Sequence, residues 1–218
     1  MTSILFPVVW ALVGAGGGWF VRWGSVRLAR LEELEPGSRG WQVYGPPILA
    51  SVLFAAFANE MGTAMLPLLL LRSVFVLVLV QVIFFDFEHR LILDRVMFPA
   101  MVLALAASLF AQTRLDPLMP WWAGIACGLG AGLLFFLLAV GGRWIFKADA
   151  MGFGDVKLAV FMGLLLGPLP TITAIFYGVF LAGLAAVGII LWHRSLKGTL
   201  AYGPYLAAGA LIVLFRFH

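Results

Sequence analysis

Residues 63–85 have the sequence TAMLPLLLLRSVFVLVLVQVIFF, and Asp86 follows directly. Arg72 is the only charged side chain within this stretch. A helix needs about 20 apolar residues to cross the hydrocarbon core of a bilayer. The stretch therefore predicts a transmembrane helix that ends at an acidic side chain.

The rest of the chain has the same apolar character. Of its 218 residues, 63% are hydrophobic and 11% are charged, whereas about 25% of the residues of an average soluble domain are charged. A soluble fold of this size could not bury so much apolar surface, and disordered chains are poor in hydrophobic residues. The composition therefore indicates an integral membrane protein.

Eight apolar segments, separated by polar or Pro/Gly-rich breaks, predict an all-α, polytopic membrane protein with about eight transmembrane helices. The segments are residues 4–21, 46–59, 63–85, 95–112, 120–142, 155–168, 170–192 and 201–215. We expect residues 1–218 to form a single domain, in which residues 22–45 are a short cytoplasmic loop.

The basic residues predict the orientation of these helices. With the N-terminus outside and eight crossings, most of the 14 Lys and Arg residues fall in cytoplasmic loops, as the positive-inside rule requires. This bias accounts for the net charge of +4 without a nucleic-acid partner. Arg72 is interpreted as structurally paired, or as lying closer to the membrane boundary than its place in the segment suggests, in preference to a functional role.

Two aspartates lie where apolar segments meet the predicted cytoplasmic face. Asp86 ends the third segment, and Asp155 begins the sixth. Gly152 and Gly154 precede Asp155, and their lack of side chains lets backbone or an extended substrate approach closely. Two carboxylates brought together share one proton, so that one is a base and the other an acid. Aspartic proteases use this arrangement to activate water against a peptide bond.

Spacing alone leaves other interpretations of these carboxylates open. Boundary aspartates are often helix caps or residues that set topology. Acidic side chains in membrane bundles also relay protons or bind cations in transporters and channels. Glu88 and His89, which follow Asp86 closely, are interpreted as ordinary polar loop residues.

The region around the second aspartate resembles a known family. Residues 152–155 read GFGD and match the Gly-x-Gly-Asp motif of intramembrane aspartyl proteases, and residues 150–158, AMGFGDVKL, are similar to the type IV prepilin leader peptidases. Asp86 and Asp94 have the spacing of the two aspartates in that family's first motif. Residues 202–209, YGPYLAAG, resemble its terminal Gly-Pro segment.

This resemblance extends from about residue 80 to the end of the chain and implies an aspartic endopeptidase with Asp86 and Asp155 as its catalytic pair. The supporting residues that it implies are Gly152, Gly154, Asp94 and Lys157. The implied substrate is a type IV prepilin or pseudopilin-like precursor, which is cut at the cytoplasmic face of the bacterial cytoplasmic (inner) membrane. Leu93 stands where the family usually has a proline.

The N-terminal part departs from the longer members of this family, which carry two Cys-x-x-Cys pairs that bind zinc and are tied to N-methylation of the product. Residues 22–45 contain no cysteine here, and the single cysteine, Cys127, lies in an apolar run. A four-cysteine zinc site is therefore impossible. The chain is similar in plan to preflagellin peptidases, and we expect no metal, no cofactor and no methyltransferase activity.

Overall fold

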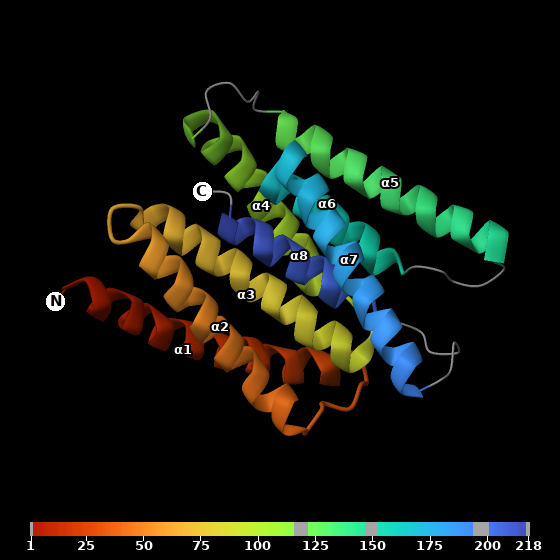
Figure 1. Cartoon of the computed structure of the whole chain (residues 1–218), viewed down its shortest axis with the longest axis horizontal. Helices are drawn as coiled ribbons and strands as arrows, with labels where there is room; N and C mark the ends of the chain where they lie inside the picture. The colour runs from red at the N-terminus through yellow and green to blue at the C-terminus, as the bar shows by residue number, and fades with distance from the viewer. Residues whose placement is uncertain (1, 116–121, 147–151, 194–200, 217–218) are drawn as a thin grey trace. The chain divides into compact units, whose positions relative to one another are not determined.

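The computed structural model describes residues 2–115, 122–146, 152–193 and 201–216 (Figure 1). Within these ranges the chain forms eight α-helices and no β-strand. The helices are α1 (Thr2–Leu31), α2 (Gly40–Met61), α3 (Leu66–His89), α4 (Asp94–Leu115), α5 (Ala123–Phe146), α6 (Phe153–Leu166), α7 (Pro168–His193) and α8 (Gly203–Arg216). Each helix coincides with one predicted apolar segment, which confirms the all-α fold class.

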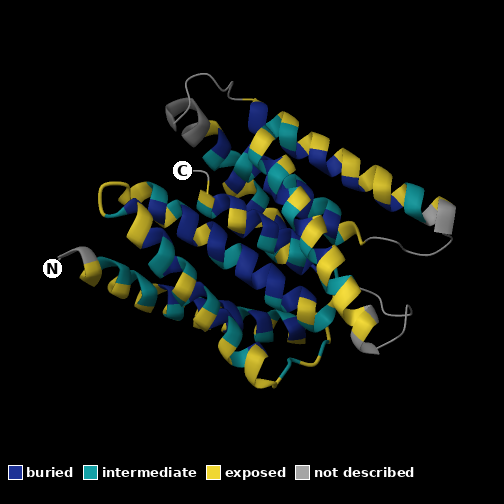
Figure 2. Cartoon of the chain, in the orientation of Figure 1, coloured by how far each residue is buried: buried dark blue, intermediate teal, exposed yellow. Residues whose placement is uncertain are grey.

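The helices form two compact units, Met1–Arg90 with α1 to α3 and Leu91–His218 with α4 to α8. In the first unit α1 packs along α2, and both contact α3. In the second unit α6 contacts α4, α5, α7 and α8, so it is the central helix. Figure 2 shows exposed residues recurring along α5, whereas α3 is mostly buried.

The connection between α1 and α2 is shorter than the sequence predicts. Residues 22–45 are expected as a loop, but α1 continues to Leu31 and α2 begins at Gly40. The N-terminus of α2 is capped by Gln42, whose Oε1 accepts a hydrogen bond of 2.8 Å from the Arg39 backbone N–H. Helices therefore extend beyond the apolar stretches that identify them, because Arg, Glu and Leu have high helix propensities.

Two glycines let helices meet backbone to backbone. A Cβ atom on Gly18 of α1 would lie 2.3 Å from the Cα of Pro47 in α2. A Cβ atom on Gly163 of α6 would lie 2.5 Å from the Cα of Gly128 in α5. Small residues permit such close helix packing in membrane proteins, so any larger residue at either position would push the paired helices apart.

Five of the helices in the described ranges, α1, α2, α3, α5 and α7, are long and apolar enough to cross a membrane. This confirms a polytopic membrane protein, but the number of crossings is about five to six rather than eight. The helices α6 and α8 have 14 residues each, which gives about 21 Å at 1.5 Å per residue, against a hydrocarbon thickness of about 30 Å. Apolar character alone does not distinguish a crossing helix from one buried among its neighbours.

Arg72 lies near the start of α3, six residues after Leu66. Its side chain is buried, and its Nη1 lies 3.7 Å from the Met61 sulfur at the end of α2. The charge of Arg72 also interacts with that of Glu60. A structural pairing near the end of the span, as predicted, therefore accounts for this residue.

Candidate active site

Asp86 lies in the last turn of α3 and is 5% exposed. The backbone carbonyl of Asp86 accepts a hydrogen bond of 2.9 Å from the Arg90 N–H, and Arg90 has a left-handed conformation with φ of 54°. This bond closes the final turn, so the helix ends at His89, three residues after Asp86. Asp86 is thus held on a rigid helix and not on the loop that follows.

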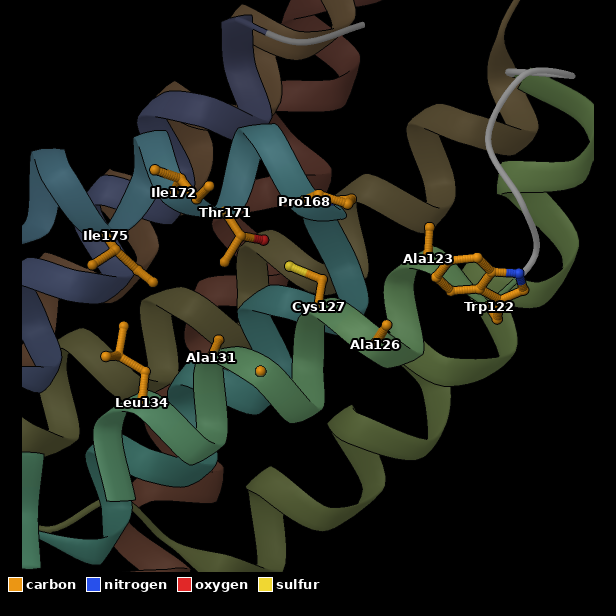
Figure 3. Close-up of a pocket in the computed structure, with 11 residues that line it drawn as sticks. Trp122, Ala123, Ala126, Cys127, Ala131, Leu134, Pro168, Thr171, Ile172 and Ile175 are labelled. Carbon is orange, nitrogen blue, oxygen red and sulfur yellow. The ribbon is translucent and has the colours of Figure 1, made fainter. Parts of the chain in front are cut away.

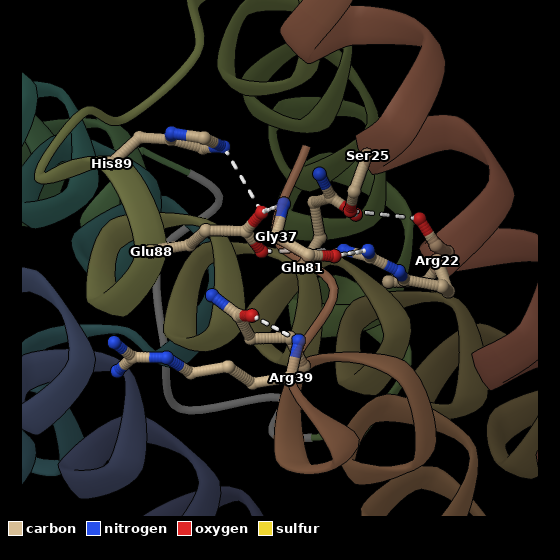
Figure 4. Close-up of polar contacts among 9 residues, drawn as sticks. Arg22, Ser25, Gly37, Arg39, Gln81, Glu88 and His89 are labelled. Atoms are coloured by element: carbon tan, nitrogen blue, oxygen red, sulfur yellow. Dashed lines mark hydrogen bonds and ion pairs between the residues drawn. The ribbon is translucent and has the colours of Figure 1, made fainter. Parts of the chain in front are cut away.

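A buried ionic cluster lies beside the same helix end (Figure 4). The Glu88 side chain is 6% exposed, and its Oε2 lies 3.2 Å from Arg22 Nη1 of α1. The other carboxylate oxygen accepts a hydrogen bond from the Gly37 backbone N–H and lies 3.3 Å from His89 Nε2. Arg22 also donates to the Gly37 carbonyl. The interpretation of Glu88 as an ordinary polar loop residue is therefore wrong, because Glu88 lies in α3 and its side chain is buried.

This cluster attaches the connection between α1 and α2 to the end of α3. A Cβ atom on Gly37 would lie 2.2 Å from the end of the Gln42 side chain, so a larger residue there would displace that side chain. A second buried polar contact joins α1 to α3, where Ser25 Oγ donates a hydrogen bond of 2.9 Å to Gln81 Oε1. In a low-dielectric setting such buried polar contacts fix one arrangement of the helices.

Asp155 is the third residue of α6 and is 8% exposed. Its backbone N–H donates to the Gly152 carbonyl at 3.1 Å, which forms the first turn of the helix. Gly152 is the residue before the helix and has an extended conformation, with φ of −76° and ψ of 151°. The carboxylate therefore lies at a helix N-terminus, where the helix dipole favours a negative charge.

The two glycines before Asp155 are constrained differently. A Cβ atom on Gly154 would lie 2.8 Å from the Cβ of Ile92. A Cβ atom on Gly152 would meet only the Gly154 nitrogen, at 3.9 Å. Gly154 is thus required for the packing of residues 91–94 against the start of α6, whereas Gly152 is not.

Asp94 and Lys157 are brought together by the second unit. The Lys157 ammonium pairs with the Asp94 carboxylate and also lies 5.4 Å from the centroid of the Phe98 ring. The side chain of Asp94 is 55% exposed. Residues 91–94 are therefore attached to the start of α6 both by this ion pair and by the contact between Ile92 and Gly154.

The predicted site residues are divided between the two units. Asp155, Gly152, Gly154, Asp94 and Lys157 lie in the second unit, and Asp86 lies in the first. The pairing of Asp86 with Asp155 stays a prediction. Among the residues that the structure describes, no group of three or more His, Cys, Asp or Glu side chains is placed to hold a metal ion.

The sequence is similar to known proteins of one family. The model of the type IV leader peptidase family matches residues 73–191, which include both buried aspartates. The prepilin leader peptidase/N-methyltransferase of Bacillus subtilis (strain 168) is 28% identical over 166 residues. The match covers 76% of this chain and 62% of that protein.

No solved structure matches this chain. The family match extends over more than half of the chain and contains Asp86, Asp94 and the Gly-Phe-Gly-Asp stretch in one continuous region. The chain belongs to the type IV leader peptidase family.

Proposed function

We propose that this chain is a membrane-embedded aspartic endopeptidase that removes the leader peptide from type IV prepilin or pseudopilin-like precursors. The observation that carries the proposal is the burial of two aspartates, Asp86 and Asp155, at helix ends inside the region matched to the leader peptidases. Acidic side chains within a membrane protein mark candidate functional sites, and a leader peptidase of the aspartic type requires two of them.

In this mechanism Asp155 is the general base and Asp86 the general acid. The helix dipole at the start of α6 stabilises the ionised form of Asp155, which removes a proton from water as it attacks the scissile carbonyl. Asp86 retains the shared proton and donates it to the departing nitrogen. The pair then shares the proton gained from water and returns to its starting state.

Asp94 is the other candidate partner for Asp155, and its surroundings argue against it. Its side chain is 55% exposed and is paired with Lys157, so its negative charge is already compensated. Asp86 is 5% exposed. We therefore assign Asp94 and Lys157 to positioning residues 91–94 beside the start of α6.

The proposed substrate has a short basic leader followed by an apolar helix. The apolar helix would lie against the enzyme within the bilayer, and the leader would reach the aspartate pair at the cytoplasmic face. The enzyme would act in the bacterial cytoplasmic (inner) membrane, in the assembly of type IV pili or in type II secretion. Both units contribute one aspartate and work together as a single protease domain.

Incubation of the purified chain with a pilin-like precursor tests this proposal. We expect a shortened product from the wild type and none from Asp86→Asn or Asp155→Asn, with the double variant no worse than either single one because the two residues act as a unit. A precursor bound but left uncut by the wild type would indicate a binding protein. Full cleavage by the Asp86→Asn variant would exclude Asp86 as the general acid.

The rival function is a proton- or cation-coupled transporter that uses the same carboxylates, and family membership speaks against it. Reconstitution in vesicles distinguishes the two functions. We expect no proton flux that depends on Asp86 or Asp155, and a flux abolished by either Asn variant would favour the transporter.

We also propose that cleavage occurs without N-methylation. The B. subtilis relative is named for both activities, but this chain has one cysteine, so it cannot form the four-cysteine zinc site implied for the longer members of the family. With S-adenosylmethionine supplied, we expect mass spectrometry to find an unmodified new N-terminus. A product heavier by one methyl group would overturn this part of the proposal.

A further inference from the structure

A cavity of about 640 Å³ lies between α5 and α7 in the second unit (Figure 3). Its walls are formed by small and branched apolar side chains, together with Cys127 and Thr171. The Thr171 hydroxyl donates at 2.5 Å to the carbonyl of Gly167, the residue before its helix. It therefore offers no free donor to a ligand, and the cavity is suited only to an apolar one.

The cavity results from uneven packing around α6. Gly128 of α5 meets Gly163 of α6 backbone to backbone, so α5 is drawn closely onto α6. The chain then turns at Gly167, whose φ is 77°, and begins α7 at Pro168. Contacts between α5 and α7 are few, so the space between them is left to a third component.

The cavity opens at the surface of the second unit, among exposed apolar side chains. Three of the residues lining it are more than half or about half exposed: Trp122 at 54%, Leu134 at 50% and Ile172 at 66%. A cavity with exposed apolar walls in a membrane-spanning unit is in contact with acyl chains and not with water. Its occupant therefore comes from within the bilayer.

The length of the cavity matches one leaflet. From Trp122 to Leu134 is twelve residues, or about 18 Å along a helix at 1.5 Å per residue. Half of the hydrocarbon thickness is about 15 Å. Tryptophan is enriched at the boundary between headgroups and hydrocarbon, so Trp122 marks the headgroup end of the cavity and Leu134 its end near the bilayer centre.

We propose that this cavity is a binding site for one acyl chain of a membrane lipid, with the headgroup beside Trp122. An apolar helix of a partner protein is the other occupant available in a bilayer. A helix about 10 Å wide and 18 Å long fills on the order of 1,400 Å³, more than twice the cavity volume. A single acyl chain is a few ångströms wide and enters without displacing α5 or α7.

Photo-crosslinking tests the proposal with the full chain in lipid nanodiscs. The probe is a phosphatidylethanolamine that carries a diazirine on one acyl chain, and the crosslinked peptides are identified by mass spectrometry. We expect peptides containing residues 122–134 and 168–175 to be labelled several-fold more than the exposed face of α1, which carries Leu12 and Phe20. Equal labelling of both surfaces would overturn the proposal.

A pair of glycine substitutions on α5 provides the matched control. Gly130 lines the cavity, Gly141 does not, and a Cβ atom on either would meet nothing within 4 Å. We expect Gly130→Phe to reduce labelling of the cavity peptides at least fivefold and Gly141→Phe to leave it unchanged. Equal labelling of the two variants would exclude the site.

A precursor with an apolar helix provides the final arm of the experiment. Added in excess, it should not reduce lipid labelling of the cavity, and displacement of the lipid would assign the cavity to the partner helix instead. Because no arm measures cleavage, these results stand or fall independently of the proposed peptidase activity.

Discussion

Gly154 and Gly152 lie on either side of Phe153, yet neighbouring atoms exclude a side chain at only one of the two positions. The Cβ atom that Gly154 lacks would overlap with Ile92, whereas the space around Gly152 is open. The motif glycine next to Asp155 is therefore a packing requirement. Packing does not require the other glycine, Gly152, and its role in the close approach of a substrate stays a prediction.

Gly154→Ala should be the damaging substitution of the two. Overpacking of this kind costs about 1–3 kcal/mol, and the shift of Ile92 would also displace the start of α6 and its carboxylate. We expect a lower melting temperature and strongly reduced cleavage for Gly154→Ala, and a melting temperature close to wild type for Gly152→Ala. Thermal unfolding is measured by circular dichroism in detergent. Equal melting temperatures of the two variants would contradict the packing role of Gly154.

Lys157→Met tests the positioning role of the pair with Asp94. The two side chains are 27% and 55% exposed, so the pair contributes no more than about 1 kcal/mol to stability. We expect near wild-type melting and cleavage reduced by less than tenfold, with Asp94→Asn giving a similar loss. Abolition of cleavage by Asp94→Asn alone, measured on the same precursor, would identify Asp94 as a catalytic acid.

The helices as elements were largely predictable, but the polar cluster between them was not. Every apolar segment is a helix, even where prolines lie inside it, because a helix satisfies its backbone hydrogen bonds internally within a membrane. Arg22 and Glu88 are 66 residues apart, and nothing in either local sequence indicates that they meet. Only the packing of α1 along α3 brings the two charges together.

The Arg22–Glu88 pair should show strong coupling. Both side chains are less than 10% exposed, and removal of one partner leaves a buried charge at a cost of about 3–5 kcal/mol. We expect Arg22→Met and Glu88→Gln each to destabilise strongly and the double variant to be no less stable than either single one. Unfolding by SDS in bicelles gives the four free energies of this double-mutant cycle.

The Asp94–Lys157 pair is the control for this cycle, because its side chains are much more exposed. Its coupling energy should be about 1 kcal/mol or less. The opposite result is that the losses in unfolding free energy caused by the Arg22 and Glu88 substitutions simply add, with a coupling energy as small as that of the control pair. This would show that the buried cluster does not stabilise the packing of α1 against α3.

The orientation of the whole molecule is tested by thiol labelling in intact cells. In a Cys127→Ala background, single cysteines at Glu35 and Gly152 should resist an impermeant maleimide, since both belong to segments rich in nearby Lys or Arg. A cysteine at Thr63, between α2 and α3, should react. Reaction at only one of positions 35 and 152 would put the two aspartates on opposite faces and exclude a shared proton.

At this scale the sequence predicted the membrane class, the fold class and the family, and it overestimated the number of crossings. Hydropathy reports how apolar a segment is and not what surrounds it, so α6, which is covered by four other helices, looks like a crossing helix. The division at Arg90 into two units was also not predictable. It depends on which helices pack together, and the sequence carries no linker at that point.

That division separates the two proposed catalytic groups, because Asp86 ends one unit and Asp155 begins a helix of the other. Neither unit alone contains both proposed catalytic carboxylates. Under the proposed mechanism hydrolysis then requires both units, so a chain that lacks either one should leave precursors uncut.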